Sequence, residues 1–161
     1  MKRIIVILLI AAMLLSGCSL FSSGKRQPVL FYYQPVNFRL GQSNGAIAAE
    51  ERDGTGHITD IDYLLRLYLT GPLTENLISP FPADVQLTSV RTGQNKVTVN
   101  LTGDPSSLSA TQKTLACACL TLTCLELTEE ESVMIFWGDE IILMDRSVLT
   151  LFDSSAQISN Q

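Results

Sequence analysis

An uncharged apolar stretch at the start of the chain confines the folded domain to the residues behind it. Met1, Lys2 and Arg3 form a short positive segment, and residues 4–15 follow without a charged side chain. A helix needs about 20 apolar residues to span a bilayer, so this stretch is too short, and small residues follow it directly. The pattern is typical of a cleaved signal peptide, here residues 1–17.

The residues at the end of this stretch carry a lipid-attachment pattern. Leu15-Ser16-Gly17-Cys18 resembles the lipobox of bacterial lipoproteins, in which a diacylglyceryl group is attached to the cysteine thiol before cleavage on its amino side. The resemblance implies that Cys18 is lipidated and holds the chain on the outer, extracytoplasmic face of the cell membrane. Ser, Gly and Pro are frequent in residues 18–28, which are expected to form a short flexible tether.

Charge and length narrow the class of the part behind the tether. Loss of Lys2 and Arg3 leaves nine of the eleven basic side chains against sixteen acidic ones, and 46% of the whole sequence is hydrophobic. A negative balance disfavours nucleic acid as a partner. Residues 29–152 have the length and composition of one compact domain with its own core, and residues 153–161 are expected to be a tail.

The remaining cysteines do not fit a disulfide framework. Once Cys18 carries lipid, Cys117, Cys119 and Cys124 form an odd set within one apolar helical stretch. Positions two apart on a helix point to different sides, and positions seven apart are separated by about two turns, beyond disulfide reach. We therefore expect three small core residues and no metal site, because the single histidine, His57, lies far from them in the sequence.

Helix and turn signals divide the domain into alternating segments. Apolar residues recur at i, i+3, i+4 and i+7 from Ile61 to Tyr68, which predicts a helix that begins near Thr59 or Asp60 and ends at Gly71-Pro72. A second helix is predicted behind residues 104–107; it runs to about residue 127, with Leu108, Leu115, Cys119, Leu122 and Leu125 toward the core. The β-type segments are residues 29–36, 46–52, 85–91, 96–101, 133–137 and 140–144.

The order of these segments indicates the fold class. Two strands, a helix, two strands, a helix and two strands are typical of an α+β protein. We predict a single domain in which the two helices pack on one face of a mostly antiparallel sheet.

Several motifs in this order resemble the GerM-type domain of bacterial sporulation and spore germination proteins. The resemblance covers residues 30–143, and its motifs are Phe31-Tyr32-Tyr33, Leu69-Thr70-Gly71-Pro72, Leu77-Ile78-Ser79-Pro80-Phe81-Pro82, Leu87-Thr88-Ser89-Val90, Val97-Thr98-Val99-Asn100-Leu101, Leu120-Thr121-Leu122-Thr123 and the segment from Val133 to Gly138. The chain departs from the family after the second helix, where Leu127-Thr128-Glu129-Glu130-Glu131 replaces a common Pro-Gly loop.

The resemblance implies a non-catalytic module that works through contacts with other envelope proteins in sporulation or germination. It also implies a fold similar to the ring-building domains of secretion and sporulation assemblies. We expect no cofactor and no metal. Candidates for the contact surface are Trp137 and Phe31-Tyr32-Tyr33, although aromatic residues on strands are more often in the core. The alternative is a module that binds an envelope ligand, such as a glycan or a peptidoglycan fragment.

A hydrolase is a further alternative, and it would use His57. This histidine lies in a Gly-rich turn near Asp53, Asp60 and Asp62. The sequence contains no nucleophile elbow, no paired metal motif and no Gly-rich phosphate loop. We therefore expect His57 to be a solvated turn residue, and Asp60 and Asp62 to stabilise the positive end of a helix.

Overall fold

The structure is a computed structural model of the chain and describes residues 26–38 and 45–147. The predicted signal peptide, Cys18, most of the tether and the predicted tail lie outside the described residues. Within the described part, no helix is both long enough and apolar enough to cross a membrane.

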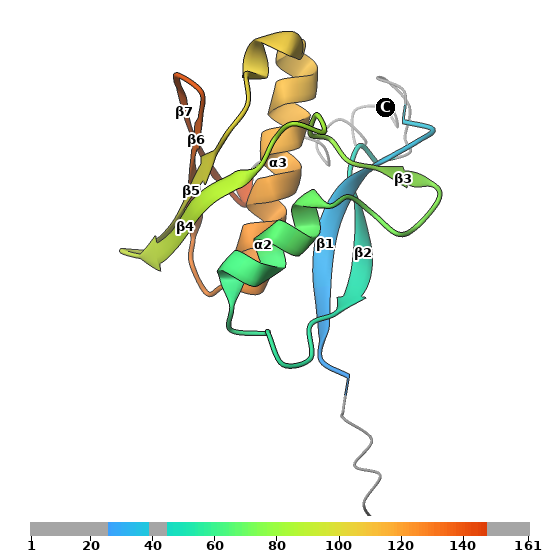
Figure 1. Cartoon of the computed structure of the whole chain (residues 1–161), viewed down its shortest axis with the longest axis vertical. Helices are drawn as coiled ribbons and strands as arrows, with labels where there is room; N and C mark the ends of the chain where they lie inside the picture. Colours follow the sequence, from blue (N-terminus) through green and yellow to red (C-terminus); the bar gives the residue numbers. More distant parts are fainter. Residues whose placement is uncertain (1–25, 39–44, 148–161) are drawn as a thin grey trace, which may run out of the picture.

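Two sheets and the helices between them make up the described domain (Figure 1). The first sheet has the order β2-β1-β3, formed by β1 Pro28–Pro35, β2 Ala48–Asp53 and β3 Leu77–Ile78. The second sheet has the order β4-β5-β6-β7, formed by β4 Leu87–Gly93, β5 Lys96–Leu101, β6 Ser132–Trp137 and β7 Glu140–Asp145. The helices are α2 Ile61–Leu69 and α3 Ala110–Leu127, with a short 3-10 helix at Pro105–Ser107 before α3.

Capping side chains fix where both helices begin. The Asp60 carboxylate accepts a hydrogen bond from the Tyr63 amide at 3.1 Å, so α2 begins where the sequence predicted. Asp104 caps the 3-10 helix, and α3 begins later, at a capping box in which the Ser109 hydroxyl and the Gln112 side chain satisfy each other's backbone amides.

The last four predicted β-type segments pair as two antiparallel hairpins, β4–β5 and β6–β7. The turn between β4 and β5 places Gln94 and Asn95 at φ 59° and 60°, a left-handed conformation that Asn tolerates well. The turn between β6 and β7 has Gly138 at φ 58°, where glycine carries no steric penalty.

The position of helix α3 distinguishes the domain from the predicted arrangement, a single sheet with both helices on one face. Helix α3 lies between the two sheets (Figure 1). Every residue from Leu115 to Leu125 is buried. No charged residue occurs in that stretch, and a helix that is apolar all round is a buried helix. Because α3 connects β5 to β6, these two strands are parallel, while the other strand pairs are antiparallel.

The core confirms most of the predicted inward positions. Cys117, Cys119 and Cys124 are buried free thiols on α3. Trp137, Phe31 and Tyr33 are completely buried, so these aromatic residues belong to the core and not to a contact surface. The segment Leu77–Ile78 forms β3 on β1, a strand too short to give a sequence signal.

Candidate interaction surface

One half of the outer face of the β4–β7 sheet, the half formed by β6 and β7, is apolar. Val133, Ile135 and Trp137 of β6 point toward α3 and are buried, so the alternate residues Met134 and Phe136 point away from it. The register places Phe136 opposite Ile141 and Met134 opposite Leu143, which brings all four side chains onto the same face. We call Met134, Phe136, Ile141 and Leu143 the β6–β7 patch.

The patch is open to solvent where β7 forms the edge of the sheet. Ile141 is 66% exposed and Leu143 is 63% exposed. On the inner face of β7, Ile142 and Met144 are partly buried and pack on the core. Single exposed apolar residues are ordinary, but adjacent ones on a sheet face are typical of an interaction site.

The other half of the outer face is polar. Asn100 on β5 lies beside Phe136 in the register, and its side-chain amide donates a hydrogen bond to the Ser89 hydroxyl at 3.0 Å. Arg91 and Thr98 face each other further along the same strands. An apolar patch with a polar border is the usual composition of a protein–protein contact surface.

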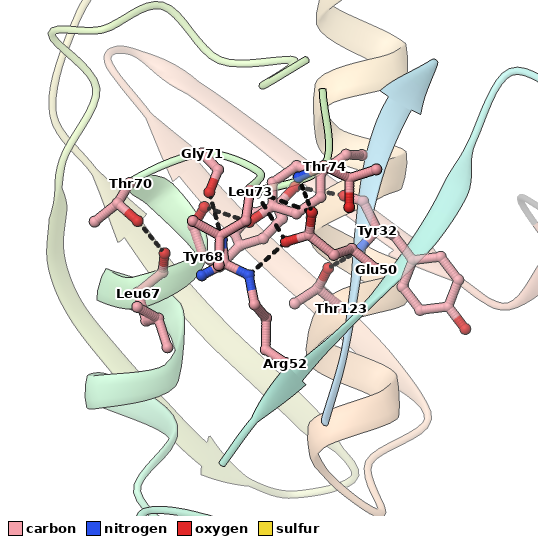
Figure 2. A network of polar contacts seen from close by, with 11 residues as sticks. Tyr32, Glu50, Arg52, Leu67, Tyr68, Thr70, Gly71, Leu73, Thr74 and Thr123 are labelled. Carbon is pink, nitrogen blue, oxygen red and sulfur yellow. Dashed lines mark hydrogen bonds and ion pairs between the residues drawn. The ribbon is translucent and has the colours of Figure 1, made fainter. Parts of the chain in front are cut away.

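A buried polar network lies on the first sheet, far from the patch in sequence (Figure 2). Glu50 on β2 forms an ion pair with Arg52 and accepts hydrogen bonds from the backbone amides of Leu73 at 2.9 Å and Thr74 at 2.7 Å. The Arg52 guanidinium donates a further bond to the Gly71 carbonyl oxygen at 2.7 Å. These contacts attach the loop that follows α2 to the edge strand β2.

The network keeps Glu50 ionised. Burial on its own raises the pKa of this carboxyl group, but the hydrogen bonds from Arg52, Thr74 and Leu73 outweigh it and lower the pKa to about 2. A carboxylate whose oxygens are occupied by three fixed partners has no oxygen directed at a substrate. The network is therefore a structural clamp.

Two tyrosines extend the packing beneath this clamp. The Tyr33 hydroxyl donates to the Tyr68 carbonyl oxygen at 2.8 Å, and the Tyr68 hydroxyl donates to the Tyr32 carbonyl oxygen at 3.1 Å. Their rings stack with centroids 4.9 Å apart. The Tyr32 amide donates to the Thr123 hydroxyl at 3.0 Å, which joins β1 to α3 (Figure 2).

The structure places His57 in an open turn. Its ring stacks on Tyr63 with centroids 3.7 Å apart, and Nδ1 lies 4.0 Å from an Asp60 carboxylate oxygen. Asp60 caps α2, and Asp62 pairs with Arg66 on the helix surface at 2.7 Å. Each carboxylate near the histidine thus has a structural partner, and none of these contacts presents a nucleophile to His57.

A groove of about 340 Å³ lies between the start of β1 and the end of α3. The described residues that line it are Pro28, Val29, Leu30, Glu51, Ile58, Glu126 and Leu127, and the polar side chains among these are the two carboxylates. Among the described residues, no three His, Cys, Asp or Glu side chains converge on a position that could hold a metal ion.

Neither the patch nor the clamp could be predicted from the sequence. The sequence predicts a strand at residues 140–144, but a run of apolar residues does not show which side chains are covered. Glu50 and Arg52 lie in the predicted β-type segment 46–52, and the loop residues that they hold, Leu73 and Gly71, are 23 and 19 residues further along the chain.

The fold and the open sheet face define a class of protein: a small α+β domain built around a buried helix, with one sheet face left bare. The chain belongs to the Germane family, described as sporulation and spore germination, whose family model matches residues 41–140. This result confirms the predicted resemblance to the GerM-type domain, and the structure confirms the predicted α+β class.

A solved structure from Bacillus subtilis shows the same fold. The tandem GerMN domains of the sporulation protein GerM from Bacillus subtilis align with a TM-score of 0.51 at 19% identity, covering 71% of this chain and 40% of that chain. The chain thus spans less than half of the GerM structure. A "putative lipoprotein" from Clostridium perfringens aligns with a TM-score of 0.46 at 16% identity, covering 76% of this chain and 89% of that chain. No curated protein matches the chain.

Proposed function

We propose that this chain is a lipid-anchored protein of the extracytoplasmic face of the cell membrane. Its Germane domain assembles with other envelope proteins during sporulation or germination and carries out no catalytic step. The observation that supports assembly best is the β6–β7 patch, where Ile141 and Leu143 are exposed side by side on an edge strand. The fold of the described residues leaves this surface exposed, and a protein partner would bury it.

The lipid anchor is proposed from the sequence pattern at Cys18. The tether of residues 18–28 spans at most about 40 Å when fully extended, so the domain works close to the membrane surface. A Cys18→Ala variant should lose lipid labelling and leave the membrane fraction. Normal labelling of that variant would contradict the anchor while leaving the interaction surface untouched.

The absence of a catalytic role is proposed from the positions of the candidate residues. His57 stacks on the Tyr63 ring and lies beside Asp60, which caps α2. The carboxylate oxygens of Glu50 accept hydrogen bonds within the clamp. We therefore expect a His57→Ala variant to support the same process in the cell as the native chain. Loss of that process in a normally folded His57→Ala protein would favour the hydrolase.

The interaction surface is tested by placing charge in the patch. The double variant Ile141→Lys and Leu143→Lys should fold and reach the membrane but fail to complement a deletion strain in sporulation or germination. Leu73→Lys is the matched control, because Leu73 is 77% exposed on a loop away from this sheet. Full complementation by the double variant would contradict assembly through the patch.

Binding of an envelope ligand is the second proposal, and the groove beside β1 supports it. Glu51 and Glu126 would attract a cationic group, such as a free amine of a peptidoglycan stem peptide. A pull-down with purified peptidoglycan that is lost in the Glu51→Gln and Glu126→Gln double variant would favour this function over protein assembly.

A further inference from the structure

We propose that the free edge of β7 receives an extended segment of a partner protein as an added strand, and that this segment has alternate apolar side chains between two basic ones. The inference rests on the proposed function, because it specifies how a partner engages the β6–β7 patch and what chemistry it brings. Three independent features of β7 lead to it: the direction of its main-chain groups, the lack of edge protection and the acidic residues at both ends.

The hairpin register determines which main-chain groups of β7 are unpaired. The two-residue turn at Gly138 and Asp139 makes Trp137 and Glu140 the closing pair, and in such a hairpin the closing pair is hydrogen-bonded. Hydrogen-bonded pairs alternate along the ladder, so Ile141 and Leu143 direct their N–H and C=O groups away from β6. The residues with exposed apolar side chains therefore also present the free backbone groups.

The other sheet edges in the described part of the chain are protected. β2 carries Glu50, Glu51, Arg52 and Asp53 in a strand of six residues, and β3 has only two residues. β4 has an irregularity in its register between Leu87 and Ser89 and carries Arg91. Charges, shortness and bulges are the usual means of preventing unwanted strand pairing.

β7 lacks these protections between its ends, because residues 141–144 carry no charge and no bulge interrupts the strand. Its sequence Glu-Ile-Ile-Leu-Met-Asp contains no lysine and no proline, and its pairing with β6 is regular from Glu140 to Asp145. An edge of this kind favours strand addition, in which main-chain hydrogen bonds supply affinity and alternate side chains supply specificity.

Acidic residues at both ends of β7 indicate the chemistry of the added strand. Asp139 precedes the strand and Asp145 ends it, and both are exposed. Asp145 accepts a hydrogen bond from the Ser147 amide at 2.8 Å, which stabilises its ionised form. Basic side chains opposite these two positions would form cross-strand ion pairs.

The same acidic residues disfavour a second copy of this chain. A symmetric antiparallel pairing centred on Ile142 would place Ile141 opposite Leu143 of the other copy, which suits the patch. It would also place Asp139 opposite Asp145 at both ends, and like charges in directly opposite positions are destabilising. The chain as a whole is negative as well. An added strand with basic ends avoids both the pairs of opposed aspartates and the repulsion between two negative chains.

The test uses two peptides and the chain from residue 18 with Cys18→Ser, which keeps every described residue. The first peptide is acetyl-Lys-Thr-Val-Thr-Val-Thr-Lys-amide; paired antiparallel to residues 139–145, it places its valines opposite Ile141 and Leu143 and its lysines opposite the aspartates. The second has glutamate in place of both lysines. Binding is measured by NMR titration, and hydrogen exchange is followed at the backbone amides of Ile141 and Leu143.

The basic peptide should slow exchange at these two amides and bind at least about tenfold more tightly than the acidic peptide, because two ion pairs are replaced by two repulsions. Leu143→Pro removes one outward N–H without removing a bond to β6 and should abolish binding, whereas Leu143→Thr keeps the N–H and should bind measurably. Asp139→Lys leaves the edge intact and should shift the preference toward the acidic peptide.

Three results would overturn strand addition by a basic partner. Equal binding of both peptides would remove the role of the aspartates. Protection of Ile141 and Leu143 in the free protein that grows with protein concentration would assign the edge to a second copy. Protection that is independent of concentration and disappears when residues 148–161 are removed would assign it to the chain's own C-terminal segment. The proposed function can survive each of these results. If the Ile141→Lys and Leu143→Lys double variant still fails to complement, assembly through the patch stands and only strand addition by a basic partner is ruled out.

Discussion

Ile141 of β7 stands directly opposite Phe136 of β6, and both side chains point away from α3. On the other side of the same strands, Ile135 is completely buried and Ile142 packs on the core. The hairpin thus has two apolar faces, of which the fold uses one. This division allows stability and partner binding to be changed separately.

Substitution in the patch should leave the fold nearly unchanged. Changing Ile141 and Leu143 to Thr removes side chains that are already in water, so we expect the free energy of unfolding to change by less than about 1 kcal/mol for the pair. Ile135→Thr is the matched control on the buried face and should cost about 2–4 kcal/mol. Urea unfolding followed by Trp137 fluorescence measures both, and similar losses for the two variants would mean that the patch is part of the core.

Removal of the Glu50 charge should destabilise the domain strongly. Glu50→Gln leaves Arg52 buried without its counter-ion and weakens the hold on the loop at Leu73, and we expect a loss of about 3 kcal/mol. Glu51→Gln, on the exposed side of the same strand, should change stability by less than about 0.5 kcal/mol. An equal effect of both substitutions in urea unfolding would rule out the clamp.

The clamp also predicts an acid-dependent loss of stability. The pKa of Glu50 is about 2 in the folded chain, below the value of about 4.3 for an unperturbed glutamate, so its contribution is complete above pH 5. The unfolded chain binds the proton first, and the contribution is lost as the pH falls from about 5 toward 2. The difference in unfolding free energy between native protein and Glu50→Gln should therefore shrink over this range. A difference that stays constant from pH 7 to pH 2.5 would contradict the assignment.

The cysteines of α3 should be inert in the folded protein. Burial raises the pKa of Cys117 to about 12 and raises the pKa values of Cys119 and Cys124 as well, so few thiolates form near neutral pH. In the Cys18→Ser chain, a disulfide reagent such as Ellman's should label no thiol rapidly in buffer and three in urea. Rapid labelling of any of the three in buffer would show that α3 is more accessible than its position between the sheets implies.

Much of the fold could be predicted from local signals. Asp60 and Gly71 bound α2, and Gly138 marks the last hairpin, because each residue type satisfies a backbone requirement within a few positions. The arrangement into two sheets could not be predicted in this way, since it depends on which elements α3 packs between. The absence of charged residues from positions 115–125 is the available signal, because a helix covered by one sheet would keep a charged or strongly polar side.

The candidate surface could not be predicted, for a related reason. Trp137 and Phe31 are the aromatic candidates for a contact surface, yet both fill the core. The exposed residues Ile141 and Leu143 alternate with covered residues that are equally apolar. Only the register with β6 shows which of these side chains face the core and which face solvent. Partner-binding surfaces on sheets are generally of this kind, because the same β-branched and aliphatic side chains serve the core and the contact.

Site-specific photo-crosslinking in the cell envelope tests the central proposal most directly. A photoreactive amino acid at position 143 reports on the patch, and one at position 78 is the matched control, because Ile78 is also exposed but lies on β3 of the other sheet. We predict a discrete protein adduct from position 143 in sporulating or germinating cells, none from position 78, and loss of the adduct when Ile141→Lys is added. Absence of an adduct at position 143, or equal adducts at both positions, would contradict assembly through the β6–β7 patch.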